Sequence, residues 1–165
     1  MNESDNNLLT CEACNNPVND DDDFCTNCGT LFIEGVFCSN HDNIAADGVC
    51  IICSLPFCKE CGFRSNNHFL CNQHSNYEIY ERMARVYGVL DDTDAQYVKA
   101  CLEQNGLHPV LFSRHQPFGG ARFTYTLFEA QGDYSGNIVT EIKVMVPCQE
   151  VLEAEEIINS IKTDQ

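Results

Sequence analysis

Cysteine and histidine residues recur at a spacing of three through the first half of this chain, and they are the residue types best suited to chemistry. Ten of the twelve cysteines precede residue 75. Eight of these ten form C-x-x-C pairs, and the other two begin C-x-x-H pairs. Disulfide bonding, redox or nucleophilic catalysis, and metal binding all use such residues. The spacing favours zinc, because two ligands on one short turn can both point at an ion about 2.3 Å away.

The start of the chain argues against a disulfide framework. The segment "MNESDNNLLT" is polar and acidic, without the basic and apolar parts of a secretory signal. The chain also has no apolar run of 18 residues that would predict a membrane span. We therefore expect a cytoplasmic protein in a reducing compartment, where stable disulfides are rare.

Residues 11–28, "CEACNNPVNDDDDFCTNC", contain two C-x-x-C pairs separated by ten residues. This spacing predicts two short turns that face each other across one zinc ion, with Cys11, Cys14, Cys25 and Cys28 as ligands. The chain often needs a positive φ after such a turn, which Gly29 adopts freely and Asn15 or Asn16 tolerates. Residues 8–34 resemble the small zinc ribbon found at the ends of many bacterial proteins.

The charge of this predicted ribbon limits its partners. Residues 1–34 contain eight acidic and no basic residues, out of a net charge of -16 for the whole chain. Contact with phosphates needs cations, so nucleic acid is an unfavoured partner and a protein partner is favoured. We expect the four aspartates at residues 20–23 to form a solvated loop, with a site for a hard cation as the alternative.

Residues 38–74 contain four further ligand pairs, enough for two tetrahedral sites. The pairs are Cys38 with His41, Cys50 with Cys53, Cys58 with Cys61, and Cys71 with His74. Spacing alone permits a sequential assignment, in which neighbouring pairs share an ion, and an interleaved one. The four-residue link "SLPF" between the second and third pairs favours a single braced module.

The order C-H, C-C, C-C, C-H in residues 36–75 resembles the B-box zinc finger. That resemblance implies the interleaved arrangement, in which Cys38, His41, Cys58 and Cys61 bind one zinc. The other zinc would be bound by Cys50, Cys53, Cys71 and His74. B-boxes commonly end with two histidines, so His68 is a competitor of Cys71 for its position.

Three zinc ions are therefore expected, each with four protein ligands. A site with four protein ligands has no open position for an activated water. Residues 11–74 also contain few large apolar side chains, so metal binding must supply most of their stability. We expect structural zinc and no catalysis.

Residues 76–165 show ordinary α/β patterning instead. Residues 76–84 are predicted to be a helical linker, and residues 85–165 an α+β domain with two helices on one face of a single sheet. The predicted strands span residues 85–90, 108–113, 122–130 and 137–146, and the predicted helices span residues 93–106 and 148–161. Thr93 and Gln96 form a capping-box pattern, and Asn105 with Gly106 predicts the helix end.

The segments "DDTDAQYVKACLEQNGLHPVLF" and "IKVMVPCQEVLEAEEII" resemble a short bacterial domain described as a putative signal-transducing protein. This resemblance implies a ferredoxin-like fold and a regulatory or sensing role, without known catalytic residues.

Few residues in this half suggest chemistry. Cys101 lies on the apolar face of its predicted helix and is expected to be a buried, inert thiol. Cys148 lies at a helix N-terminus, where the dipole would lower its pKa, but Glu150 opposes this effect. The loop between Arg114 and Arg122, next to His115, could receive a small anionic effector; a plain hairpin loop is the alternative.

The sequence as a whole predicts a zinc-binding adaptor or signalling protein that acts through protein–protein interaction. The alternatives are a nucleic-acid-binding regulator that uses the zinc fingers, and a redox sensor that releases zinc when its thiolates are oxidised. An enzyme that uses the 114–122 loop would need a bound anion there.

Overall fold

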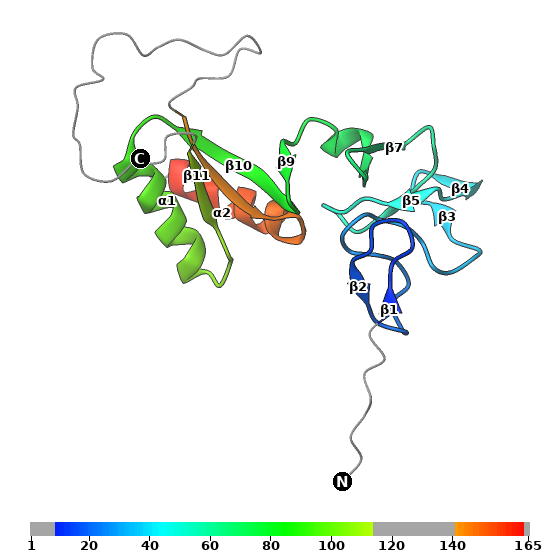
Figure 1. Cartoon of the computed structure of the whole chain (residues 1–165). Helices are drawn as coiled ribbons and strands as arrows, with labels where there is room; N and C mark the ends of the chain where they lie inside the picture. The colour runs from blue at the N-terminus through cyan, green and yellow to red at the C-terminus, as the bar shows by residue number, and fades with distance from the viewer. Residues whose placement is uncertain (1–8, 114–140, 164–165) are drawn as a thin grey trace, which may run out of the picture. The chain divides into compact units, whose positions relative to one another are not determined.

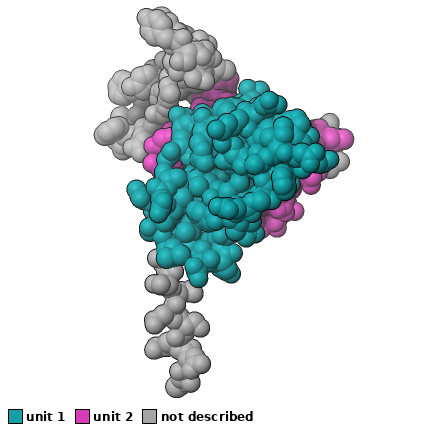
Figure 2. Space-filling view, turned by 90° about the vertical axis from the view of Figure 1, so that its right-hand side faces the viewer, with its two compact units in different colours: residues 1–77 teal, residues 78–165 magenta. Residues whose placement is uncertain are grey.

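The computed structural model describes residues 9–113 and 141–163 and divides the chain into two compact units, residues 1–77 and 78–165 (Figure 2). The first unit contains both segments predicted to bind metal. The second contains the predicted α/β domain. Each unit is described separately below.

The first part of unit 1 is a small hairpin with a turn at each cysteine pair. Strands β1 (Leu9–Thr10) and β2 (Pro17–Val18) pair antiparallel, and the first C-x-x-C turn connects them (Figure 1). An isolated bridge between Phe24 and Leu31 closes the second turn. Two-residue strands are too short to be stable by themselves, so this segment depends on what its cysteines bind.

The rest of unit 1 consists of three two-stranded antiparallel sheets, β3 with β4, β5 with β6, and β7 with β8. A short 3-10 helix, η1 (Asn72–His74), follows and carries the last ligand. The strands are β3 (Phe37–Cys38), β4 (His41–Ala45), β5 (Gly48–Val49), β6 (Pro56–Phe57), β7 (Gly62–Ser65) and β8 (His68–Cys71).

Phe69 joins the predicted ribbon to the second metal-binding segment. Its side chain is fully buried, and it lies against the backbone of three glycines. A Cβ atom added at Gly29, Gly48 or Gly62 would lie 2.9, 2.7 or 2.7 Å from atoms of Phe69. The backbone N–H of Phe69 also donates to the carbonyl of Cys28, at 3.0 Å. The two segments therefore share one core.

The described residues of unit 2 form a four-stranded antiparallel sheet with two helices. The strand order is β11-β12-β10-β9, and every neighbouring pair is antiparallel. The elements are β9 (Ile79–Tyr80), β10 (Met83–Val89), α1 (Asp92–Gln104), β11 (Val110–Ser113), β12 (Ile142–Pro147), the 3-10 helix η2 (Cys148–Glu150) and α2 (Val151–Thr163).

Both helices contact the two central strands and each other, so they cover the same face of the sheet (Figure 1). Val144 and Val146 of β12 are fully buried, as are Leu102 of α1 and Val151 and Ala154 of α2. The described residues therefore confirm the predicted α+β arrangement, in which two helices cover one face of a sheet. The ferredoxin-like fold stays a prediction, because the strand expected at 122–130 lies outside the described residues.

The prediction of a helical linker at residues 76–84 is wrong. The segment forms β9 and the start of β10, connected by a turn in which Glu81 and Arg82 have φ values of 45° and 70°. Ala84 pairs with Ile79 and is fully buried. Burial in the sheet therefore outweighs the helix propensity of a sequence rich in Glu, Arg, Met and Ala.

The start of α1 also differs from its prediction, whereas its end agrees. Thr93 lies inside the helix, which begins at Asp92 with Asp91 at the N-cap position and no side-chain cap bond. The helix ends at Asn105 and Gly106 as predicted, because Gly106 adopts a φ of 85° that suits glycine best.

Candidate metal centres

The ten cysteines of unit 1 and two of its histidines gather into three groups of four. Within each group, the candidate ligand atoms all lie within 4.8 Å of one another. The groups are Cys11, Cys14, Cys25 and Cys28; Cys38, His41, Cys58 and Cys61; and Cys50, Cys53, Cys71 and His74. The second segment thus has the interleaved arrangement, not the sequential one.

The separations between these atoms match a tetrahedron around zinc. Zn–S bonds of about 2.3 Å give sulfur–sulfur edges of about 3.8 Å, and a Zn–N bond of about 2.0 Å gives sulfur–nitrogen edges of about 3.5 Å. The Sγ atoms of Cys11 and Cys28 are 3.7 Å apart, and those of Cys14 and Cys25 are 3.6 Å apart. A disulfide would need about 2.05 Å. The donor set therefore fits zinc.

Each histidine of the second segment presents its Nδ1 atom to the sulfurs. In His41 this atom lies 3.6, 3.5 and 3.5 Å from the three sulfurs of its group. In His74 it lies 3.2 Å from the sulfur of Cys71 and 3.5 Å from that of Cys50. Because these distances are close to the edge of a zinc tetrahedron, the histidines complete both groups.

His68 does not compete with Cys71. Its Nδ1 atom lies 2.8 Å from the carbonyl oxygen of Asn27, in the ribbon segment. The side chain of Cys71 is buried and belongs to the third group. His68 is therefore a contact between the two segments of unit 1, not a candidate ligand.

Three of the C-x-x-C turns are closed by the same pair of backbone hydrogen bonds. In the turn at Cys11, the N–H of Asn15 donates to the carbonyl of Cys11 at 2.7 Å, and the N–H of Cys11 donates to Asn16 at 2.9 Å. The turns that begin at Cys25 and Cys50 repeat this pattern. In the folded unit, these bonds thus hold both sulfurs of each pair in place for one ion.

The residue after each of these turns has a positive φ. Asn15 has a φ of 57° and Gly29 a φ of 75°, as their positions predict. Ser54 has a φ of 57°, which the sequence analysis missed. Its position directly after the Cys50–Cys53 pair is the signal that would have identified it, since it matches the positions of Asn15 and Gly29.

Within the ribbon site, the environment shifts the thiol pKa values in opposite directions. Burial raises the pKa of Cys25 to about 12 and also raises the pKa of Cys11. Burial opposes ionisation of Cys14 too, but hydrogen bonds from the Asn27 side chain and the Asn16 backbone outweigh it and lower the pKa to about 7. The thiol of Cys14 therefore ionises more readily than those of Cys11 and Cys25.

The other two sites each contain a thiol with a lowered pKa as well. A hydrogen bond from Cys53 lowers the pKa of Cys50 to about 4, against the effect of burial. Burial would raise the pKa of Cys38, but backbone N–H groups of Cys58 and Asn40, together with His41, lower it to about 6. Each group thus favours a negative charge in the absence of metal, which zinc would neutralise.

Two polar side chains next to the groups contact ligand sulfurs directly. The hydroxyl of Thr30 lies 3.1 Å from the sulfur of Cys28, and the amide nitrogen of Asn40 donates to the sulfur of Cys61 at 3.3 Å. Such donors orient ligands and stabilise thiolates. The sequence analysis missed both, although each lies within two residues of a predicted ligand.

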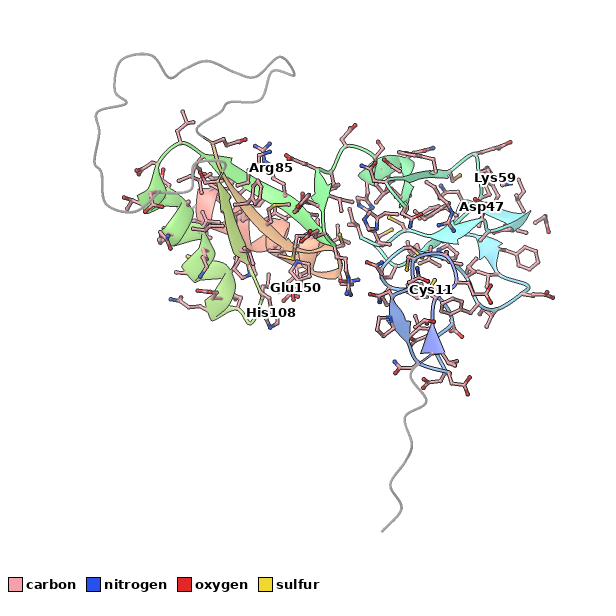
Figure 3. The ribbon with its side chains drawn as sticks, in the orientation of Figure 1. Cys11, Asp47, Lys59, Arg85, His108 and Glu150 are labelled. Carbon is pink, nitrogen blue, oxygen red and sulfur yellow. The ribbon has the colours of Figure 1, made fainter. Side chains whose placement is uncertain are left out.

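The candidate residues of unit 2 that the structure describes belong to none of the three groups. Cys148 is 1% exposed, and Cys101 is partly buried. His108 bonds to Glu150, with its Nδ1 atom 2.7 Å from Oε1, and the two side chains point toward one another (Figure 3). Arg114, His115 and the rest of the predicted anion loop lie outside the described residues.

Comparison of the chain with known protein families, with curated proteins and with solved structures found no match. The resemblances to the zinc ribbon, the B-box and the signal-transducing domain therefore rest on the sequence patterns alone. Among residues 9–113 and 141–163, no helix is long and apolar enough to cross a membrane.

Proposed function

We propose that the chain is a zinc-binding adaptor or signalling protein that acts through protein–protein contacts, with zinc in a purely structural role. The observation that carries this proposal is the set of three groups with four ligands each. A tetrahedral ion bound by four protein ligands has no position for substrate or water. Zinc would then serve to hold the loops of unit 1 in place.

The surface of unit 1 supports contact with a protein. Several large apolar side chains are 41–54% exposed although the unit has a small core, and they are Phe32, Ile33, Phe37, Ile44 and Phe63. Exposed apolar and aromatic side chains are typical of the centre of protein interfaces. Burial of these side chains against a partner would contribute binding energy.

The charges of unit 1 make a nucleic acid an unfavoured partner. Lys59 and Arg64 are the only lysine and arginine before residue 78. Lys59 pairs with Asp47 at 3.5 Å (Figure 3). Arg64 donates to the carbonyl of Cys28 at 3.4 Å and to the hydroxyl of Thr30 at 3.2 Å. Arg64 is therefore engaged within the protein, and the exposed Lys59 is a single cation beside an acidic side chain, so unit 1 has little positive charge with which to contact phosphates.

For unit 2 we propose the regulatory role that its resemblance to a signal-transducing domain implies. The support is the α+β arrangement and the absence, among the described residues, of a further cluster of metal-binding side chains. In this proposal the unit is not an enzyme but binds a partner or a small effector.

Site-specific photo-crosslinking in the native cells tests the proposal. A photoreactive phenylalanine analogue replaces Phe37, which is 54% exposed in β3; the control places it at Asp42, an exposed residue of β4. We expect a discrete protein adduct from position 37 that disappears when zinc is chelated. Adducts with nucleic acid, or equal adducts from both positions, would contradict the proposal.

A further inference from the structure

The ribbon segment contains an open groove of about 590 Å³. One side is lined by β1 and the first C-x-x-C turn. The other sides are lined by the end of β2 with the loop after it, and by residues 30–32. A volume of this size is within the range of protein sites that accept ligands or side chains, about 300–1,000 Å³. None of the zinc ligands lines it, so it is separate from the metal centre.

The groove is lined by apolar side chains that are not part of the ribbon's buried core. Leu9 and Phe32 line it and are 42% and 41% exposed, while Val18 is nearly buried at its edge. The buried cluster of the ribbon consists of Val18 and three cysteines. Leu9 and Phe32 are thus excluded from that core and remain available to an apolar side chain of a partner.

The same groove is lined by carboxylates. Glu12, Asp20 and Asp22 belong to it, and no lysine, arginine or histidine of the described residues does. Asp22 is held in place, because its Oδ2 atom accepts a hydrogen bond of 2.8 Å from the backbone N–H of Asn19. This one carboxylate is therefore fixed before a partner arrives, which lowers the entropy cost of pairing it with a cation.

We propose that this groove binds an extended segment of the partner protein that carries lysine or arginine on either side of a large apolar residue. The apolar residue would lie against Leu9 and Phe32, and the cations would face Glu12 and Asp20. Charge complementarity selects this occupant, because residues 1–34 carry eight acidic and no basic residues. The inference rests on the proposed function and specifies the chemistry of the partner.

A random nonapeptide phage library, selected on the zinc-loaded full chain, identifies the preferred sequence. We expect enrichment of peptides with one large apolar residue flanked by lysine or arginine. Enrichment of acidic or proline-rich peptides, or no consensus at all, would overturn the inference.

Titration of the enriched peptide against matched variants then tests the location. Phe32→Ser should weaken binding at least about tenfold, as is common for an apolar residue at the centre of an interface. Leu55→Ser should leave binding unchanged, because Leu55 is 48% exposed in unit 1 but lies outside the groove. Equal effects of both variants would contradict the assignment.

A second pair of variants separates the groove from the overall negative charge. Glu12→Gln with Asp20→Asn should weaken binding at least about tenfold, and Asp42→Asn with Glu60→Gln, which removes two charges elsewhere in unit 1, should weaken it less than about threefold. Equal weakening would show that only the net charge matters. Zinc content and circular dichroism confirm that each variant is folded.

The two proposals fail in different ways. Crosslinks from position 37 without any effect of the groove variants would leave the adaptor function in place and overturn the groove. If peptides bind in the groove but position 37 crosslinks only to nucleic acid, the adaptor function is overturned. The groove then remains a peptide-binding site.

Discussion

At the scale of single residues, backbone N–H groups next to the cysteines favour the thiolates that zinc binds. The N–H groups of Ala13 and Cys14 bond to the sulfur of Cys11, and such bonds favour the thiolate by lowering its pKa, although burial raises the pKa overall. In the turn at Cys25, the backbone N–H groups of Cys28 and Asn27 bond to the sulfur of Cys25 in the same way. Zinc binding and folding of unit 1 therefore occur together, and the ion replaces protons on the sulfurs.

Replacing one ligand should empty one site. Cys14→Ser removes the ribbon thiol whose pKa is lowered to about 7, and serine is a poor zinc ligand. We expect two zinc ions per chain instead of three, and zinc binding at this site more than about 100-fold weaker, since loss even of an outer contact to a ligand costs 10–100-fold. Mass spectrometry under native conditions and competition with a chelator measure both.

The matched control is Cys101→Ser, because Cys101 lies in α1 outside all three groups. It should keep three zinc ions. A variant at Cys14 that still binds three ions would show that this residue is not a ligand.

Zinc binding should release protons and weaken as the pH falls. Burial raises the pKa of Cys11, Cys25 and Cys71, and a hydrogen bond to Cys50 raises that of Cys53. Without metal, these thiols stay protonated at neutral pH, so zinc must displace at least two protons at each of two sites. The apparent affinity there should fall at least about 100-fold for each pH unit below 7.

Calorimetry in buffers with different ionisation enthalpies counts the released protons. A zinc affinity that is constant between pH 6 and pH 8, without proton release, would contradict thiolate ligation.

At the scale of elements, local patterns were predictable and long-range contacts were not. The C-x-x-C turns, the positive φ at Gly29 and the end of α1 at Gly106 follow from spacing and residue type. The helix predicted at residues 76–84 failed because the pairing of β9 with β10 depends on a sheet formed with β12, far along the chain. Propensity cannot show such a partner.

The candidate site was predictable to a similar extent. Residue type and spacing identified all twelve members of the three groups, but spacing alone left their pairing open. The interleaved grouping depends on β7 and β8, which bring Cys61 and Cys71, members of different groups, side by side at the open end of one hairpin. The burial of Phe69 against three glycines had no sequence signal, because a glycine that contacts a ring looks like any other glycine.

Gly29 should be far less tolerant of substitution than Gly35. Both have a positive φ, 75° and 78°, so alanine at either position costs about 1–2 kcal/mol from backbone strain. At Gly29 a Cβ atom would also lie 2.0 Å from the carbonyl oxygen of Val49, whereas at Gly35 nothing lies within 4 Å. Gly29→Ala should therefore lower the free energy of unfolding of unit 1 by at least about 2 kcal/mol more than Gly35→Ala.

Chemical denaturation of the zinc-loaded variants measures the difference. Equal losses of stability would show that the ribbon and β5 do not approach each other as closely as the structure has them.

At the scale of the whole molecule, the two units derive their stability from different sources. Unit 2 buries a continuous apolar layer between its sheet and its helices, including Val144, Leu102 and Ile158. Unit 1 has strands of two to five residues and ten buried or partly buried cysteines. The first unit should therefore depend on metal and the second should not.

Removal of zinc should unfold one unit and spare the other. After treatment with a chelator under reducing conditions, amide hydrogens of β7 and β8 should lose protection from exchange, whereas those of β10, β12, α1 and α2 should keep it. Hydrogen exchange followed by mass spectrometry resolves the two sets. Loss of protection in both units would contradict separate sources of stability.

The number of zinc ions bound to the purified, reduced chain tests the central claim most directly. Mass spectrometry under native conditions, with and without a chelator, gives this number. We predict three zinc ions per chain, all removed by the chelator, as the three groups of four ligands require. A folded chain with one ion or none would contradict the account. It would instead favour redox chemistry or disulfide bonding as the role of the cysteines.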